Sequence, residues 1–388
     1  MKTLNPLCFV LLLVVLSTAA CRKTSDEISA ENVVHLSKDD FEKKFRASEI
    51  FESVDFVPLE TNDSCLIGKV EKILVSSDEI IVQSSKSIFV FDRKGKFKRR
   101  IYRLGHGPYE YTALHDLSIM NNGNYLLLDT QIKKIIVLDP NGIPLCEQKI
   151  SFFADAVESL NDTILVFSGS GFDHRILLWD ILKKTKVKSY LPYDERYSCS
   201  ISKPLVKYGK EVYYRHEFLS GVYKVTEKKI YYKWHIDFGD RTVKEKSLKC
   251  FSFMGSSIYM NPPHTATPYS FTETDDCLFF QFTCEELNAG KPYFVFYSKK
   301  TGNKVILDYR YEDDLSFYFA PPSALTATPE GGLVDVYLPA NWLKHLKEKE
   351  SVIMKSQFKF AYEEFKSRMR NMNAFDNPVI VIYTLKKF

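Results

Sequence analysis

The fold is decided by Ile88-Phe89-Val90-Phe91-Asp92 and by the turn Arg93-Lys94-Gly95 that follows it. Similar short apolar strands, several with the same kind of turn, recur along the chain. The five further copies are residues 135–139, 176–180, 222–226, 293–297 and 379–383. Successive copies start 47, 41, 46, 71 and 86 residues apart. Three of these spacings lie near the period of about 40–45 residues that is typical of β-propeller blades, and the two longer ones indicate insertions.

Two further strands precede each copy, which completes the inner part of a blade. The second strands are expected at 79–83, 125–129, 163–167, 211–215, 277–281 and 333–337. The first strands are expected at 70–76, 115–120, 154–160, 203–207, 268–273 and 323–328. Turn sequences such as Asn122-Gly123-Asn124 join the two, as in β-hairpins. The continuous apolar runs are typical of strands covered on both faces. We therefore predict an all-β fold, a six-bladed β-propeller with four-stranded blades.

The last blade lacks a fourth strand, because the chain ends soon after residue 383. Residues 51–59 precede the first blade and have the alternation of a strand. We predict that they complete the last sheet and so remove its free edge. Residues 341–372 combine apolar and charged residues at helical spacing, which predicts one or two amphipathic helices inserted in that blade. The alternative is that they only cover the rim of the sheet.

The start of the chain predicts export. Met1-Lys2-Thr3 is basic, residues 6–16 are apolar but too short to span a bilayer, and Ala19 and Ala20 precede Cys21. This pattern is typical of a bacterial lipoprotein signal peptide, residues 1–20, with acylation of Cys21; an ordinary secretory signal is the alternative. We expect residues 21–48 to form a flexible tether and residues 49–388 the propeller. The acyl chains would hold the protein to the outer membrane, on a face that the sequence does not decide.

The composition excludes several other classes of function. The formal net charge is +4 with both signs interspersed, so nucleic acid is not an expected partner. Beyond the signal and Cys21, six cysteines lie at irregular spacings, which indicates neither a disulfide scaffold nor a zinc site. We expect these cysteines to be mostly free and buried. No pattern indicates a metal site or a cofactor.

Five short motifs carry a resemblance to a known family. They are 57–60 (Val-Pro-Leu-Glu), 66–70 (Leu-Ile-Gly-Lys-Val), 91–96 (Phe-Asp-Arg-Lys-Gly-Lys), 104–111 (Leu-Gly-His-Gly-Pro-Tyr-Glu-Tyr) and 376–379 (Asp-Asn-Pro-Val). With them the chain resembles the six-bladed β-propeller lipoproteins common in Bacteroides and its relatives, which are related to NHL-type propellers. The resemblance covers essentially the whole mature chain, and it implies a fold more than an activity, because most members lack an assigned one. Tyr109 stands where the family usually has a third Gly, and we expect it to avoid a positive φ.

The functional residues of a propeller commonly lie where second strands end and blades join, because these loops share one face around the central channel. The second strands end at Gln83, Asp129, Phe167, Arg215, Gln281 and Tyr337. Our ligand-binding candidates on this face are Arg103, His106, Glu110, Tyr111, Asp129, Gln131, His174, Arg215, His216, Gln281 and Tyr337. Mixed acids, bases, amides and aromatics suit a polar organic ligand such as a sugar or a peptide. For each residue the alternative is a hydrogen bond that closes a turn or joins two blades.

Three functions are consistent with these residues. The first is a membrane-anchored envelope module that binds a glycan or peptide ligand, with nutrient capture as one role. The second is a hydrolase or lyase at the channel mouth, in which Asp129, Arg215 and His216 would supply a base, an anion clamp and an acid. The third is a structural partner of another envelope protein, which would dock on the helical insertion. Common catalytic motifs, such as Gly-x-Ser-x-Gly and His-Glu-x-x-His, are absent from the sequence.

Overall fold

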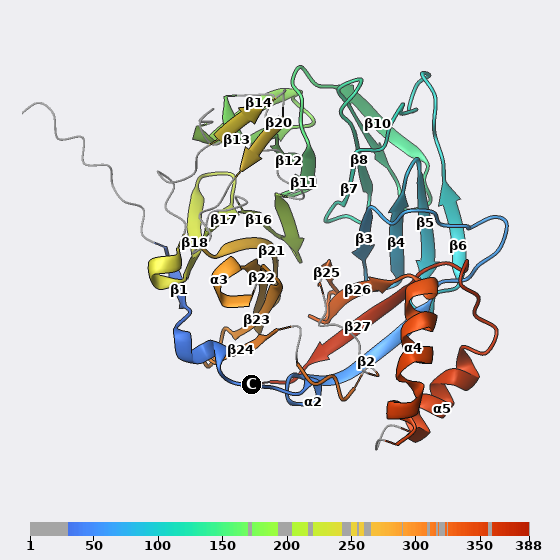
Figure 1. Ribbon diagram of the computed structural model, residues 1–388. Coiled ribbons are helices and arrows are strands. Elements are labelled where there is room, and N and C mark those ends of the chain that lie inside the picture. The colour runs from blue at the N-terminus through green and yellow to red at the C-terminus, as the bar shows by residue number, and fades with distance from the viewer. Residues whose placement is uncertain are drawn as a thin grey trace, which may run out of the picture.

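Six four-stranded sheets form a ring in a computed structural model of the chain (Figure 1). The structure describes residues 30–169, 173–192, 204–215, 220–242, 250–253, 256–259, 265–288, 290–308, 311–315, 317, 323, 325–355 and 359–387. The four strands of each blade are antiparallel, and in blades 1 to 5 they follow one another from the channel outward in chain order. The predicted six-bladed β-propeller is therefore confirmed.

The strands of the six blades are named here from the channel outward. Blade 1 contains β3 (Lys72–Val75), β4 (Glu79–Ser84), β5 (Ser87–Asp92) and β6 (Phe97–Ile101). Blade 2 contains β7 (Asp116–Ile119), β8 (Tyr125–Asp129), β9 (Lys134–Leu138) and β10 (Pro144–Lys149). Blade 3 contains β11 (Ala156–Ser159), β12 (Ile164–Ser168), β13 (His174–Asp180) and β14 (Thr185–Pro192). Blade 4 contains β15 (Leu205–Tyr208), β16 (Glu211–Arg215), β17 (Gly221–Val225) and β18 (Ile230–Asp237). Blade 5 contains β21 (Thr267–Glu273), β22 (Cys277–Thr283), β23 (Pro292–Ser298) and β24 (Lys304–Leu307). Blade 6 contains β25 (Thr326–Ala327), β26 (Leu333–Tyr337), β27 (Val379–Leu385) and β2 (Phe51–Pro58).

The N-terminal strand β2 closes the ring, as predicted. It pairs antiparallel with β27, with Val57 opposite Ile380 and Val54 opposite Tyr383. The turn of blade 1 fits tightly against the end of β2. Gly95 has a φ of 83°, and a Cβ at this position would lie only 2.1 Å from the carbonyl oxygen of Pro58. Only glycine therefore allows blade 6 to approach blade 1 this closely.

The segment before β2 is not a tether. β1 (Asn32–His35) adds a fifth, parallel strand to blade 4, and η1 (Lys38–Phe41) and α2 (Ala47–Ile50) follow it. Lys304 on β24 donates a hydrogen bond to Asp40 at 2.6 Å, so the segment also lies against blade 5. The prediction of a flexible tether is therefore wrong for residues 32–48. The buried side chains of Val34 and Leu36 anchor this segment to the propeller. The predicted signal peptide, Cys21 and the rest of the tether lie outside the described residues.

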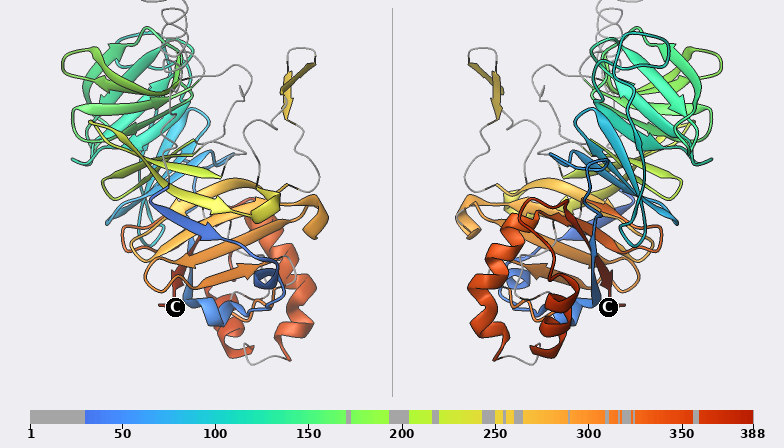
Figure 2. Two further views of the ribbon diagram at one scale, coloured as in Figure 1. Left: turned by 90° about the vertical axis from the view of Figure 1, so that its left-hand side faces the viewer. Right: turned by 90° about the vertical axis from the view of Figure 1, so that its right-hand side faces the viewer.

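The two long repeat spacings contain insertions, as predicted. One holds the hairpin of β19 (Cys250–Phe253) and β20 (Ser256–Tyr259), and the other holds α4 (Pro339–Ile353) and α5 (Lys359–Arg368). Both views in Figure 2 show the helices α4 and α5 at the end of the molecule away from blades 2 and 3. The remaining short helices in the part of the chain that the structure describes are η3 (Gly239–Arg241) and α3 (Glu285–Asn288). No helix among the described residues is long and apolar enough to cross a membrane.

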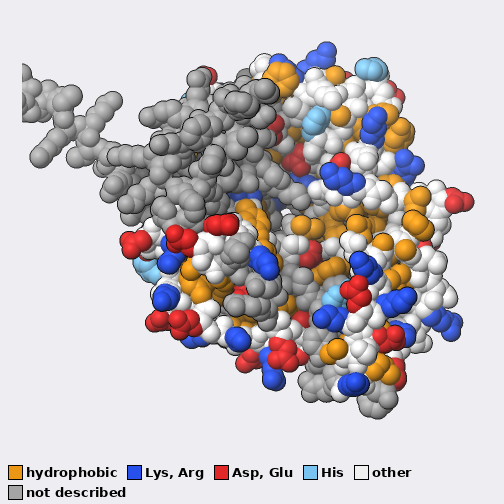
Figure 3. All heavy atoms as spheres, in the orientation of Figure 1, with side chains coloured by type: hydrophobic (Ala, Val, Ile, Leu, Met, Phe, Trp, Pro, Cys, Tyr) orange, Lys and Arg blue, Asp and Glu red, His pale blue; other side chains and the backbone are white. Residues whose placement is uncertain are grey.

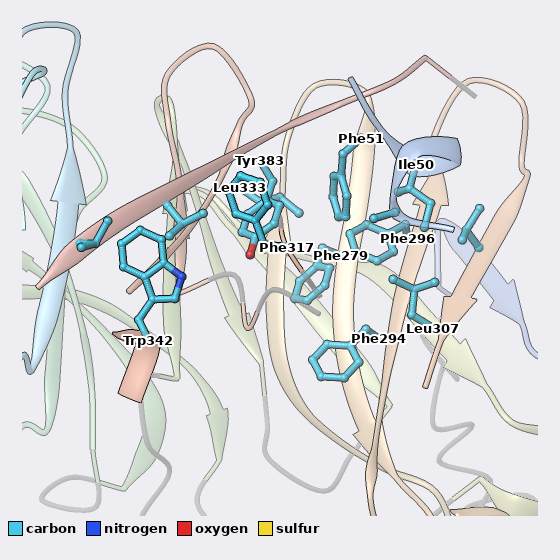
Figure 4. Close-up of a cluster of buried hydrophobic side chains, with 14 of the residues drawn as sticks. Ile50, Phe51, Phe279, Phe294, Phe296, Leu307, Phe317, Leu333, Trp342 and Tyr383 are labelled. Carbon is cyan, nitrogen blue, oxygen red and sulfur yellow. The ribbon is translucent and has the colours of Figure 1, made fainter. Parts of the chain in front are cut away.

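The helical insertion completes a core at the closure. Trp342 of α4 is fully buried, and its ring stacks on Phe56 of β2 with 5.2 Å between centroids. Phe365 of α5 contacts the same indole ring at 4.8 Å. Figure 4 shows Trp342 in one cluster with Phe51 of β2 and aromatic residues of blade 5. The insertion therefore packs against the closing strand.

The cysteine prediction is confirmed in part. Cys65, Cys277 and Cys284 are buried thiols outside any disulfide, whereas Cys146 is exposed on the outer strand β10. β10 lies at the rim of its blade, where only one face is covered, and the sequence pattern did not distinguish it from a buried strand.

A charged network joins blades 1 and 2 and makes stability depend on pH. Arg99 donates to both carboxylate oxygens of Glu79, at 2.8 and 2.9 Å, and Tyr125 of blade 2 donates to the same carboxylate at 3.2 Å. Burial would raise the pKa of Glu79, but the hydrogen bonds and charges of Arg99 and Lys98 outweigh it and lower that pKa to about 2. A carboxyl group with a depressed pKa stabilises the fold only while it is ionised.

We predict that Glu79→Gln lowers the free energy of unfolding by about 1 kcal/mol near neutral pH, since the network is partly solvated. The difference in melting temperature between wild type and variant should stay constant above the ordinary Glu pKa of 4.5 and shrink as the pH falls toward 2. Thermal unfolding across this range measures it. Glu52→Gln, at an exposed position of β2, is the control and should change little. If the difference in melting temperature between wild type and Glu79→Gln is undiminished at pH 2, the lowered pKa of Glu79 is wrong.

Candidate functional site

The inner strands of all six blades enclose a cavity of about 650 Å³ in the central channel. In Figure 3 the face of Figure 1 is hollowed near its middle, with hydrophobic side chains beside the hollow. The residues that line the cavity are Glu71, Lys72, Ile73, Leu74, Gln83, His115, Asp116, Asp155, Ala156, Glu158, Leu205, Val206, Lys207, Arg215, Tyr269, Ser270, Phe271, Thr272, Gln281, Ser323, Leu325, Thr326 and Ala327. A cavity of this size suits a ligand as large as a disaccharide or a short peptide.

The charged side chains of the cavity come from blades 1 to 4. At its centre, Lys72 of β3 donates to Asp116 of β7 at 2.8 Å and to Glu158 of β11 at 3.1 Å. Burial alone would lower the pKa of Lys72, but the two carboxylates outweigh it and hold that pKa above its usual range. This ion triad joins the inner strands of three consecutive blades.

A second lysine lies on the wall of the same cavity. Lys207 of β15 donates to the hydroxyl of Ser159 at 2.6 Å and to the carbonyl oxygen of Ile119 at 2.8 Å. Burial lowers the pKa of Lys207, and the charge of Glu158 opposes that shift only in part. Lys207 forms no ion pair with a carboxylate among the residues that the structure describes.

Blades 5 and 6 contribute an uncharged wall. Their lining residues are Tyr269, Ser270, Phe271, Thr272, Gln281, Ser323, Leu325, Thr326 and Ala327. Hydroxyl, amide and aromatic groups therefore face a wall that carries both signs of charge. Such a cavity offers donors and acceptors together with apolar surface, and the opposite charges at its centre largely neutralise each other.

Two buried neutral oxygen atoms of the lining have no hydrogen-bond partner among the described residues. They are Oε1 of Gln83, whose residue is 2% exposed, and Oγ of Ser270. The amide nitrogen of Gln83 donates to the carbonyl oxygen of Leu114 at 2.9 Å, which orients the side chain and leaves Oε1 as the free acceptor. An unsatisfied buried polar atom costs about 1–3 kcal/mol, so these two atoms favour a bound polar group.

Two of the predicted candidates line this cavity, Arg215 and Gln281. Gln281 donates to the carbonyl oxygen of Ser323 at 2.7 Å and so joins blade 5 to the chain that enters blade 6. His216, the third candidate near them, lies outside the described residues.

Asp129 is placed at the end of β8 as expected, but its carboxylate holds the local backbone. One oxygen accepts hydrogen bonds from the N–H groups of Thr112 and Ala113 at 2.6 and 3.1 Å, and the other from those of Gln131 and Ile132. Burial would raise the pKa of Asp129, but these hydrogen bonds outweigh it and lower that pKa. Because both carboxylate oxygens accept these hydrogen bonds, Asp129 holds the segment at Thr112 to the turn at Gln131 in this structure.

The segment from Arg103 to Tyr111 lies away from the cavity. Arg103 and Glu110 border a separate depression of about 360 Å³, where blade 1 meets the outer hairpin of blade 2. Tyr111 is buried and donates to the carbonyl oxygen of Lys86 at 2.7 Å, and Glu110 accepts the N–H of Gly107 at 2.7 Å. His106 is exposed. The structure therefore does not bring these four candidates to the channel, because they follow the outer strand β6.

The backbone of Tyr109, in the same segment, contradicts the prediction that this residue avoids a positive φ. Its φ is 56°, so it adopts the left-handed conformation that we expected it to avoid. The N–H of Tyr109 donates to the carboxylate of Glu147 on β10 at 2.6 Å, and this bond across two blades offsets part of the strain.

The remaining candidates are also outside the cavity lining. Gln131 is exposed beside Thr112, and His174 is half-buried at the start of β13. The hydroxyl group of Tyr337 lies 3.1 Å from that of Tyr383 on β27, inside blade 6. These three residues do not meet one another or the ion triad.

The sequence analysis missed the residues of the first strands. Lys72, Asp116, Glu158 and Lys207 each place a charge in an otherwise apolar inner strand. A charge in a strand that should be buried is costly unless it is paired, so this pattern was an available signal. His115 was also missed at the rim. Its Nδ1 accepts the N–H of Thr130 at 3.1 Å, so Nε2 carries the proton of the neutral ring.

Comparisons with known proteins support the fold. The crystal structure of a "Putative exported protein (BF0058)" from Bacteroides fragilis is similar with a TM-score of 0.69 and 17% identity, covering 92% of this chain and all of that one. A member of the DUF4221 family from Bacteroides vulgatus is similar with a TM-score of 0.50 and 8% identity, covering 87% of this chain and 98% of that one. No curated protein is detectably similar in sequence. The model of a family described as "Domain of unknown function (DUF4934)" matches residues 31–384.

Proposed function

The chain belongs to the DUF4934 family, and for this member we propose that the central cavity binds a small polar organic ligand. The ligand is of the size of a mono- or disaccharide or of a di- or tripeptide. The observation that carries the proposal is a pair of buried atoms without a partner among the described residues, Gln83 Oε1 and Ser270 Oγ, in side chains that line a cavity of about 650 Å³. A ligand with hydroxyl or N–H donors satisfies both.

The charges of the cavity favour a ligand without a large net charge. The lining holds four acidic side chains (Glu71, Asp116, Asp155 and Glu158) and three basic ones (Lys72, Lys207 and Arg215), so its charges nearly balance. Lys72 is already engaged by two carboxylates. Phe271, which is buried, and Tyr269 offer an apolar and aromatic surface from blade 5. A ligand with hydroxyl or amide groups on one side and C–H groups on the other would match the polar wall and the aromatic wall of the cavity.

We place this binding module outside the cytoplasm, held to a membrane by acylated Cys21. The signal sequence and the residues before Cys21 support this location. So does the description of the BF0058 protein as exported. Capture of a glycan or peptide nutrient in the envelope is the role that fits such a location.

The ligand should be found by thermal shift of residues 22–388 with a panel of neutral mono- and disaccharides, uronic acids, and di- and tripeptides. A compound at a hundred times its dissociation constant adds about 2.7 kcal/mol to the free energy of unfolding. Ser270→Ala should then weaken binding of that compound about 5- to 10-fold, because it removes one hydrogen bond to the ligand. Isothermal titration calorimetry measures the change.

Ser220→Ala is the matched control for this variant. The hydroxyl group of Ser220 is also buried without a partner among the described residues, but Ser220 does not line the cavity. Its substitution should leave the affinity unchanged. The proposal fails if no compound in the panel shifts the wild-type protein, or if both serine variants weaken binding equally.

A further inference from the structure

A band of lysines and exposed apolar side chains covers the outer edge of blades 2 to 4, far from the central cavity. We define this basic edge by Ile143, Leu145, Leu182, Lys183, Lys184, Lys186, Val187, Lys188, Lys228 and Lys229. In Figure 1 its strands β10 and β14 lie at the rim of the ring, on the side away from α4 and α5. The residues come from three consecutive blades, so they form one surface only in the folded protein.

Contacts between the blades show that the edge is continuous. Lys188 on β14 donates to the carbonyl oxygen of Lys228, in the hairpin between β17 and β18, at 2.7 Å. On the other side, Trp179 on β13 donates a hydrogen bond to Gln148 on β10 at 3.4 Å, so blade 3 also lies against the outer strand of blade 2. The lysines of blades 3 and 4 therefore lie side by side, next to the exposed strand β10 of blade 2.

The positive charge of the edge is largely uncompensated. Lys183 pairs with Asp180 at 3.4 Å. Among the described residues, the other five lysines form no ion pair with a carboxylate. The nearby Glu227 accepts a hydrogen bond from Asn161, which lies in the hairpin between the inner strands β11 and β12 and not on the outer strand β14.

Apolar side chains lie among these lysines and are unusually open to solvent. Leu182 is 72% exposed and Ile143 is 58% exposed, and Leu145 and Val187 are about half exposed. Lysines mixed with exposed aliphatic side chains match the interface of a bilayer, where cations meet headgroup phosphates and aliphatic groups enter the acyl boundary.

The N-terminal segment leaves the propeller at this same edge. β1 is parallel to β18, and the N–H of Glu31 donates to the carbonyl oxygen of Tyr232 at 2.8 Å. The chain before Asn32 therefore points back along β18 toward the hairpin that holds Lys228 and Lys229. Cys21 is nine residues before Ala30, so it can lie at most about 30 Å from that point.

We propose that the basic edge is a membrane-binding surface that docks on anionic lipid headgroups. It lies beside the exit of the chain that leads to Cys21, so an acyl anchor and the edge would engage the same bilayer. Two such signals hold a protein to a membrane in one orientation, which a single flexible anchor does not. The inference does not depend on the ligand of the central cavity.

The test uses residues 22–388, which contain every element of the closed propeller but no acyl chain. Flotation with vesicles of 70% phosphatidylcholine and 30% phosphatidylglycerol should recover the protein at low salt. Binding should be lost at high salt and with pure phosphatidylcholine, since the attraction is electrostatic. Substituting Lys184, Lys186, Lys228 and Lys229 with Gln should lower the partition coefficient by about 100-fold or more, because each lysine near an anionic surface contributes about 1 kcal/mol.

The control changes the net charge equally at another place. The control variant replaces four other exposed lysines with Gln: Lys43, in the loop after η1, and Lys344, Lys347 and Lys349 on α4. This variant should bind the vesicles less than about 3-fold more weakly than the wild type. Equal losses in the two variants would overturn the proposal, as would wild-type protein that binds these vesicles no better than neutral ones. Binding to heparin without binding to the vesicles would also overturn it, in favour of an anionic glycan.

Discussion

Lys72→Met should lower the free energy of unfolding by about 3–5 kcal/mol, the largest effect that we expect from a substitution in the cavity. Asp116 and Glu158 are only 8% and 3% exposed, and Lys72 is the lysine that forms an ion pair with both. Removing it leaves two carboxylates buried and close together without the lysine that pairs with them. Chemical denaturation followed by tryptophan fluorescence measures the loss.

Lys207→Met is the control within the same cavity. Lys207 donates to neutral oxygens of Ser159 and Ile119, so its loss should cost only about 1–2 kcal/mol. Adding Glu158→Gln to Lys72→Met should restore more than half of the lost stability, because one of the two buried charges is then removed. A Lys72→Met variant no less stable than Lys207→Met would show that the triad does not hold the inner strands together.

Trp342→Ala should also cost about 3–5 kcal/mol, because it removes a fully buried indole from the closure of the ring. The indole stacks on Phe56 of β2 and contacts Phe365 of α5, so the cavity left behind borders the closing strand. Exchange of the backbone amide hydrogens that pair β2 with β27 should become faster than exchange in blades 2 and 3. Thermal unfolding and hydrogen–deuterium exchange measure the two effects.

Lys347→Ala, on the exposed face of the same helix, is the control and should change the stability by less than about 0.5 kcal/mol. If Trp342→Ala lowers the melting temperature but the amide hydrogens of β2 exchange no faster, the helical insertion stabilises only itself and not the pairing of β2 with β27. The role that the structure assigns to α4 would then be wrong.

Much of the fold could be predicted because each blade is specified locally. The third strands, such as residues 88–92 and 135–139, are apolar on both faces and end in turn sequences, so the repeat is visible without any long-range information. The closure by residues 51–58 could be predicted for a topological reason, since a last blade without a fourth strand must find one elsewhere. The tether was mispredicted because only two side chains, Val34 and Leu36, bury residues 32–36 among many charges.

The candidate site was predicted only in part. Arg215 and Gln281 line the cavity because the second strands were aligned correctly, and every second strand ends at the same face. Arg103, His106, Glu110 and Tyr111 were assigned to that face too, but the chain at these positions still lies near the outer strand of blade 1. Position along a blade can be read from the repeat, whereas distance from the channel axis depends on how the blade twists.

The sequence by itself determined the number of blades, their four strands, the closing strand and the place of the helical insertion, because alternation and turn residues act over a few neighbouring residues. Only the tertiary structure decided which polar residues meet. Lys72, Asp116 and Glu158 are separated by about forty residues from one to the next and come together because the ring brings the inner strands of three blades to one axis. The lysines of blades 3 and 4 likewise form a surface only through the packing of one blade against the next.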